Sequence, residues 1–166
     1  MHEPKKLIDT PSQTAGPFLH IGCTPRITGI NIFKSELGLT PFQDISDNEA
    51  INIKGKIYDG NGEPIIDAMI ETWQCDANGN YSSNQGFARI VTDFKTGEYQ
   101  LKTIRPGNKI NTDDSLSASY ITFWIVARGM NRPLITRMYF LENDLKNDLM
   151  LNNIKIEDRL NTLIPY

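Results

Sequence analysis

Histidine and cysteine are scarce in this sequence, with two of each among 166 residues. A catalytic zinc or iron site needs at least three side-chain ligands, drawn mainly from His, Cys, Asp and Glu. His2 and His20 both lie near the start of the chain, and no His-x-His, Glu-x-x-His or Cys-x-x-Cys pair occurs. The sequence therefore predicts no metal site made by this chain alone.

The same scarcity argues against nucleophilic catalysis. A Ser or Cys nucleophile needs a neighbouring base, usually His, and His20 is the only candidate base. No G-x-S-x-G stretch is present. Cys75 precedes a turn, so we expect a small packed residue there rather than a reactive thiol. Cys23 and Cys75 are too few for a disulfide framework and fit a reducing cytoplasm.

Other features are also absent. The formal charge of −3 leaves no basic footprint for nucleic acid or membrane surfaces. No apolar run approaches the roughly 18 to 20 residues that span a bilayer. The first residues contain no apolar segment of the kind found in secretory signals. We therefore expect one cytoplasmic domain with a single hydrophobic core.

The first 50 residues are expected to form an irregular arm. Five prolines interrupt them at a spacing that no long helix tolerates: Pro4, Pro11, Pro17, Pro25 and Pro41. So long a segment without regular structure is uncommon in a compact domain unless it lies against something. We therefore expect residues 1–50 to have a function of their own or to lie against something.

Residues 51–166 are predicted to form an all-β sandwich. Apolar and polar residues alternate from Ile51, and "DGNG" (59–62) is a strong hairpin signal rather than a nucleotide loop, because no helix follows it. Short β-branched and aromatic segments recur between turns. The predicted strands cover 51–59, 64–74, 87–93, 99–104, 120–129 and 133–140. Leucine and isoleucine spacing in 142–164 predicts one or two short helices.

Arg128 ends the apolar run of the fifth predicted strand. A guanidinium at the mouth of a buried strand can hold a carboxylate through two hydrogen bonds. It can equally pair with one of the chain's own acids. The residues alone leave both interpretations open.

Five motifs together resemble one family. They are "TPSQTAGPFLHIG" (10–22), "YDGNG" (58–62), "WQCDANGNY" (73–81), "ARGMN" (127–131) and "TRMYF" (136–140). Their order is similar to that of the intradiol ring-cleaving dioxygenases, and within them of the alpha subunits of the protocatechuate 3,4-dioxygenases. The resemblance extends over about residues 9–164.

This resemblance implies a heteromer of alpha and beta subunits with β-sandwich cores. The beta subunit holds a non-haem Fe(III) through two tyrosines and two histidines. The enzyme cleaves protocatechuate, a catechol, between its hydroxyl-bearing carbons with O2, giving 3-carboxy-cis,cis-muconate. Matched to this chain, the ligand positions fall on Tyr81, on Asn108 or Lys109, on Tyr120 and on Thr122. Only the first is a family ligand, so the chain is implied to bind no iron and to have no catalytic residues.

The resemblance also implies that residues 1–50 pack on the partner subunit and have a role beside its site. Alpha subunits of this family border the substrate pocket of the beta subunit with the residues that match Thr14, Gly16, Pro17, Phe18 and Arg128. Phe18 departs from the tyrosine that is usual there. A Gly-Pro bend lets backbone approach a flat ring, and a guanidinium attracts an aromatic carboxylate.

Three alternatives stay open at this point. The chain could be a catalytic intradiol enzyme, which the missing histidines disfavour. It could be a β-sandwich binding or scaffold module, which would have no reason to carry the "TPSQTAGP" arm. It could also be a truncated remnant, since residues 51–166 lack the closing pair of strands that family members have. That last feature predicts an exposed sheet edge and a dependence on a partner that covers it.

Overall fold

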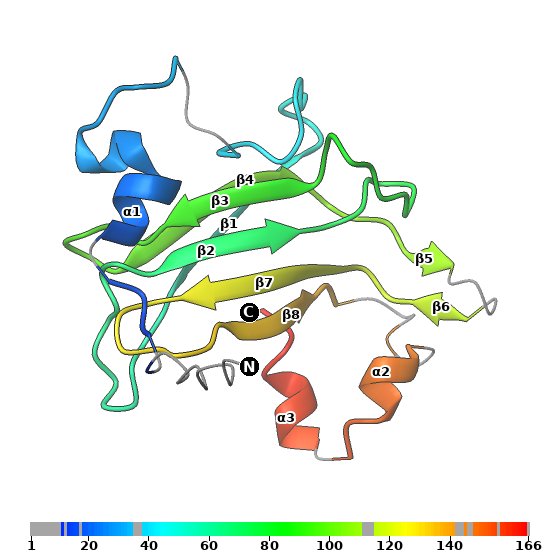
Figure 1. The fold of residues 1–166 in the computed structure, drawn as a ribbon. Coiled ribbons are helices and arrows are strands. Elements are labelled where there is room, and N and C mark those ends of the chain that lie inside the picture. Colours follow the sequence, from blue (N-terminus) through cyan, green and yellow to red (C-terminus); the bar gives the residue numbers. More distant parts are fainter. Residues whose placement is uncertain are drawn as a thin grey trace, which may run out of the picture.

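Two antiparallel sheets pack face to face in the computed structural model, which describes residues 11, 13–16, 18–34, 38–110, 115–141, 145, 148–155 and 157–165 (Figure 1). One sheet pairs β1 (Ala50–Lys56) with β4 (Glu98–Ile104). The other has the order β3 (Phe87–Val91), β2 (Met69–Trp73), β7 (Tyr120–Val126) and β8 (Leu134–Tyr139). The predicted all-β sandwich is confirmed.

The hydrophobic core lies between these sheets. In β7, Ile121, Phe123 and Ile125 are buried and alternate with half-buried residues, as the period of two in a strand requires. They join Ile70 of β2 and Leu101 of β4 in one cluster. Every second residue of the four-stranded sheet therefore points to its outer face, away from the β1–β4 sheet.

Some predicted strand boundaries need correction, and one short ladder was not predicted. The segment 64–74 was predicted as one strand, but β2 begins only at Met69. Before it, Pro64 forms a bridge with Tyr58, and the Ile65 amide donates to the Ile57 carbonyl at 2.7 Å, so a small loop closes before the chain crosses to the other sheet. β7 ends at Val126 rather than at residue 129. The ladder of β5 (Lys109–Ile110) and β6 (Leu116–Ser117) was not predicted.

The arm is less irregular than predicted. It contains α1 (Phe18–Cys23) and the 3-10 helix η1 (Pro25–Thr28). Six residues suffice for a short helix between two prolines, and proline is tolerated in the first turn of the next one. Part of the arm packs on its own chain, because His20 is buried and the Cys23 carbonyl accepts from Arg89 Nη1 at 3.3 Å.

The tail contains the two short helices expected from its sequence, α2 (Leu149–Asn152) and α3 (Glu157–Asn161). Asp148 caps α2 by accepting from the Met150 and Leu151 amides, and its other oxygen accepts from the Ala118 amide at 3.0 Å. The Tyr139 amide donates to the Leu163 carbonyl at 2.8 Å, which ties the tail to β8. Across the described ranges, no helix has the length and apolar character to cross a bilayer.

Candidate functional site

The positions that match the family's iron ligands meet at one end of the four-stranded sheet. Tyr120 begins β7 and Thr122 follows on the same face, while Tyr81 comes from the turn after β2 and Lys109 from β5. The Tyr81 hydroxyl donates to the Tyr120 hydroxyl at 3.2 Å. The Lys109 ammonium lies 5.1 Å from the centre of the Tyr81 ring. We call this group, with Arg137, the phenol cluster.

A tight turn sets the place of Tyr81. Asp76 Oδ1 accepts from the Asn78 and Asn80 amides, which closes the "DANGN" turn. Gly79 has a φ of +83°, and a Cβ on it would lie 2.1 Å from the Asn108 carbonyl oxygen. Only glycine permits this close approach of two loops. Tyr81 then stacks on Trp73 with ring centres 5.9 Å apart.

Arg137 is a member of the phenol cluster that sequence reasoning missed. It lies directly opposite Thr122 in the β7–β8 register, just as Tyr139 lies opposite Tyr120. Its guanidinium carbon is 4.1 Å from the centre of the Tyr120 ring, and its Nη1 donates to the Tyr139 hydroxyl at 3.2 Å. The motif "TRMYF" contains it, but only strand pairing shows which residues it faces.

The electrostatics of the phenol cluster do not suit a metal ion. Burial, followed by the hydrogen bond with Tyr120, raises the pKa of Tyr81 well above its usual range, so its phenol stays protonated. Burial also raises the pKa of Tyr139. Lys109 and Arg137 place two positive charges where a cation would bind. Among the described residues, no three His, Cys, Asp or Glu side chains lie together as ligands.

The second predicted group, the arm residues and Arg128, gathers elsewhere. Ala15 forms a parallel bridge with Arg128, and the Gly16 carbonyl accepts from the Leu19 amide at 3.0 Å as α1 begins. Thr14 is exposed, and its hydroxyl donates to the Ala15 carbonyl at 3.3 Å. Phe18 is 78% exposed. Pro17 lies outside the described residues.

Arg128 pairs through its Nε with the Asp67 carboxylate. Of the two interpretations left open by the sequence, pairing with one of the chain's own acids is therefore confirmed. Its side chain is nevertheless 65% exposed, whereas that of Asp67 is 17% exposed. The ion pair engages one edge of the guanidinium. A carboxylate arriving from solvent could therefore still meet the Nη groups. That Arg128 and the arm bind substrate stays a prediction.

The two groups lie at opposite ends of β7. Tyr120 opens the strand and Arg128 follows its other end, so they are separated by on the order of 25 Å at the rise of an extended chain. Figure 1 shows the same arrangement, with α1 at one end of the sheet and β5 and β6 at the other. Ala15 and α1 therefore lie away from the phenol cluster of their own chain.

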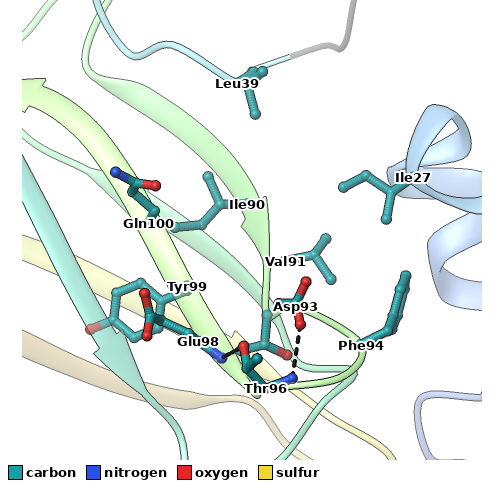
Figure 2. Close-up of a pocket in the computed structure, with 11 residues that line it drawn as sticks. Ile27, Leu39, Ile90, Val91, Asp93, Phe94, Thr96, Glu98, Tyr99 and Gln100 are labelled. Carbon is teal, nitrogen blue, oxygen red and sulfur yellow. Dashed lines mark hydrogen bonds between the residues drawn. The ribbon is translucent and has the colours of Figure 1, made fainter.

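Two surface cavities lie near these groups. One, of about 520 Å³, opens beside Thr122, Arg137 and Met150. The other, of about 480 Å³, lies between η1 and the turn from β3 to β4, where Figure 2 shows Ile27 and Phe94 on one side of it. The lining of the second cavity includes none of the predicted substrate-binding residues.

His20, the candidate base, and Cys75, the candidate thiol, have structural roles. His20 Nε2 donates to the Asp67 carbonyl at 3.0 Å. Cys75 is 3% exposed, and its thiol donates to the Gly107 carbonyl at 3.4 Å. Burial raises the pKa of this thiol, which keeps it from forming a thiolate. The prediction that Cys75 is a packed residue is confirmed.

Comparison with known proteins agrees with the motifs. The family model described as "Dioxygenase" matches residues 34–161. The protocatechuate 3,4-dioxygenase alpha chain of Pseudomonas putida is 36% identical over 95% of this chain and 83% of its own length. The protocatechuate 3,4-dioxygenase beta chain of Burkholderia cepacia is 28% identical over 55% of this chain and 45% of its own.

A solved structure shows the same fold. Catechol 1,2-dioxygenase from Pseudomonas arvilla C-1 superposes with a TM-score of 0.59 at 22% identity, over 66% of this chain and 41% of that one. The chain thus spans less than half of the length of that enzyme. The resemblance found in the motifs is confirmed, and the chain belongs to the dioxygenase family of intradiol ring-cleaving enzymes.

Proposed function

We propose that this chain is the non-catalytic alpha-type subunit of a protocatechuate 3,4-dioxygenase and lines the substrate pocket of an iron-bearing beta subunit. The observation that carries the proposal is the separation along β7. In the phenol cluster only Tyr81 fits the iron ligands that the resemblance implies, and Ala15 and α1 lie with Arg128 at the other end of the strand. An arm placed there serves a site on another chain.

The chemistry divides between the two subunits. Fe(III), held by the beta subunit, would supply the binding of the catechol oxygens and the activation of the ring toward O2. Both atoms of O2 enter the ring-opened product, 3-carboxy-cis,cis-muconate. This chain contributes a carboxylate-binding arginine, Arg128, and an arm that excludes water and holds the ring in place.

Exposed apolar side chains on the arm and on β8 support the presence of a partner subunit. Phe18 is a large apolar side chain that meets little of its own chain. Leu134 and Ile135 are also largely exposed, 53% and 65%, on the edge strand β8. An edge strand with exposed apolar residues needs cover. We propose that the beta-type subunit covers part of this surface, with residues 1–50 packed on it.

The first test is co-purification. A tagged chain is isolated from its native cells, and iron and protein partners are measured in the eluate. An iron-containing partner with two tyrosine and two histidine ligands supports the proposal. A chain that elutes alone and without iron supports a binding module or a remnant instead. Iron in the isolated chain would mean that it is catalytic itself.

The role of Arg128 is tested in the heteromer. Arg128→Ala should raise KM for protocatechuate about tenfold or more, since a charge-assisted bidentate contact is lost. Arg132→Ala is the matched control, because Arg132 is an exposed arginine on the same connection to β8. A KM that is unchanged in the Arg128 variant would remove this residue from the pocket.

A substitution at Gly16 tests the role of the arm separately from that of Arg128. Nothing lies within 4 Å of a Cβ built on Gly16, so the chain itself tolerates a side chain there. Gly16→Val should leave the stability of the isolated chain unchanged but reduce assembly or turnover of the heteromer. Gly60→Val is the control, because its surroundings are equally open. Full activity of the Gly16 variant would place the arm outside the pocket.

Location and pathway are part of the proposal. Both cysteines are free thiols, which fits the cytoplasm. An enzyme that opens a catechol ring belongs to the catabolism of aromatic compounds.

A further inference from the structure

Asp67 joins the two parts of the chain that the proposed function assigns to the pocket. It lies just before β2, at the same end of the sheet as α1. Its carboxylate pairs with Arg128 Nε, and its carbonyl accepts from His20 Nε2 at 3.0 Å. One residue thus contacts the arm through its main chain and the arginine through its side chain.

The surroundings keep these contacts in place. His20 is buried, its Nδ1 lies 3.2 Å from Thr24 Oγ1, and its ring meets the Phe94 ring edge-on at 5.7 Å. The bridge between Ala15 and Arg128 ties the arm to the same point from the other side. The arginine backbone and the start of α1 are therefore held relative to Asp67.

We propose that Asp67 is a positioning residue that orients Arg128 for an aromatic carboxylate. The inference rests on the proposed function of Arg128 and goes one step beyond it. The carboxylate of Asp67 holds the Nε side of the guanidinium, so that the Nη groups face outward. An arginine that is oriented before binding loses less side-chain freedom when the ligand arrives.

The negative charge of Asp67 has an opposing effect, because it weakens the attraction of Arg128 for an anion. These charges lie closer together than the screening length of about 8 Å, but water around the mostly exposed Arg128 weakens their interaction. Loss of orientation does not depend on salt. We therefore expect the positioning effect to be the larger one and to persist at high ionic strength.

The test uses the heteromer obtained by co-expression with the beta-type chain from the same source. Asp67→Asn removes the charge but retains the backbone carbonyl that His20 contacts. It should raise KM for protocatechuate about three- to tenfold at both low and high salt, with kcat changed less than twofold. Turnover of catechol, which has no carboxylate, should change less than twofold. Asp67→Glu, which retains a carboxylate, should raise KM less than Asp67→Asn does.

A double variant separates positioning from a structural role. If Asp67 acts through Arg128, Asp67→Asn adds no further change in KM to Arg128→Ala. Additive effects, a lowered KM, or an equal loss with catechol would overturn the positioning role. Glu63→Gln, which removes an exposed carboxylate from the preceding turn, controls for net charge.

Failure of the inference is distinguishable from failure of the proposed function. If Arg128→Ala leaves KM unchanged, the pocket role of Arg128 itself is wrong. If Arg128→Ala raises KM and Asp67→Asn does not, only the positioning role of Asp67 is wrong. Should Asp67→Asn fail to assemble, Arg128→Lys retains the charge without the Nε contact. Its KM should then be raised as in Arg128→Ala, and a wild-type KM would overturn the inference.

Discussion

The hydroxyl of Tyr81 donates a hydrogen bond to the hydroxyl of Tyr120 across 3.2 Å, at the position that the resemblance matches to the family's iron ligands. Burial and this hydrogen bond together favour the protonated form of Tyr81. Arg137 over one ring and Lys109 over the other supply positive charge without a metal. The chain thus stabilises this position with cation–π contacts and hydrogen bonds from its own side chains.

High pH should weaken the fold through its tyrosines. The pKa values of Tyr81, Tyr99 and Tyr139 are raised by burial, so the native state retains protons that the unfolded state releases above about pH 10. The stability from these groups is present below pH 10 and is lost as pH rises beyond it. Urea unfolding at pH 8, 10 and 11 measures how steeply the free energy of unfolding falls with pH. This fall should be less steep in Tyr81→Phe than in the unchanged chain.

The control for this measurement is Tyr58→Phe, which changes a tyrosine that is 57% exposed. Its pH dependence of the free energy of unfolding should match that of the unchanged chain, because this substitution leaves Tyr81, Tyr99 and Tyr139 in place. A Tyr81→Phe slope equal to that of the control would mean that the Tyr81 phenol is not protected by its surroundings.

Arg137 should contribute measurably to stability. Arg137→Met retains most of the apolar stem but removes the contact with the Tyr120 ring and the bond to the Tyr139 hydroxyl. We expect the free energy of unfolding to fall by about 1–3 kcal/mol. Lys102→Met breaks the exposed pair with Asp47 and should change it by less than about 1 kcal/mol. Equal effects of the two substitutions would contradict a special role for Arg137.

Gly79 should tolerate no side chain. A Cβ at this position meets the Asn108 carbonyl oxygen at 2.1 Å, and its φ of +83° is unfavourable for other residues. Gly79→Ala should therefore destabilise the chain by roughly 1–3 kcal/mol or more. Gly60→Ala is the matched turn variant, with nothing within 4 Å of the added Cβ, and should be close to neutral. Thermal unfolding of both variants compares them directly.

The arm should loosen when Glu71 is removed. Glu71 accepts from Arg89 Nε at 2.8 Å, and Arg89 Nη1 in turn donates to the Cys23 carbonyl at the end of α1. Glu71→Ala leaves a half-buried guanidinium without its carboxylate and should cost about 1–3 kcal/mol. Limited proteolysis should then cut within residues 11–34 faster. Glu98→Ala, at an exposed position, is expected to leave the cleavage rate unchanged.

Much of the sandwich could be predicted, because its signals are local. Alternation from Ile51 and in the run from Tyr120 to Val126 reflects the two faces of a strand, and the "DGNG" and "DANGN" turns separate the strands. The extent of β2 was predicted wrongly, since apolar residues before Met69 serve a loop rather than a ladder. α1 was missed because a helix of six residues between prolines carries little signal.

The family and the all-β class follow from residue identity and short-range pattern. So does the mismatch of Asn108 or Lys109, Tyr120 and Thr122 with the iron ligands that the resemblance implies. Strand pairing and tertiary contacts are needed to show that Arg137 faces Thr122, that Asp67 pairs with Arg128, and that Ala15 lies at the far end of β7 from the phenol cluster. These facts depend on strand register and on contacts between residues far apart in the chain. A shift of one residue in register would turn Arg137 to the other face of its sheet.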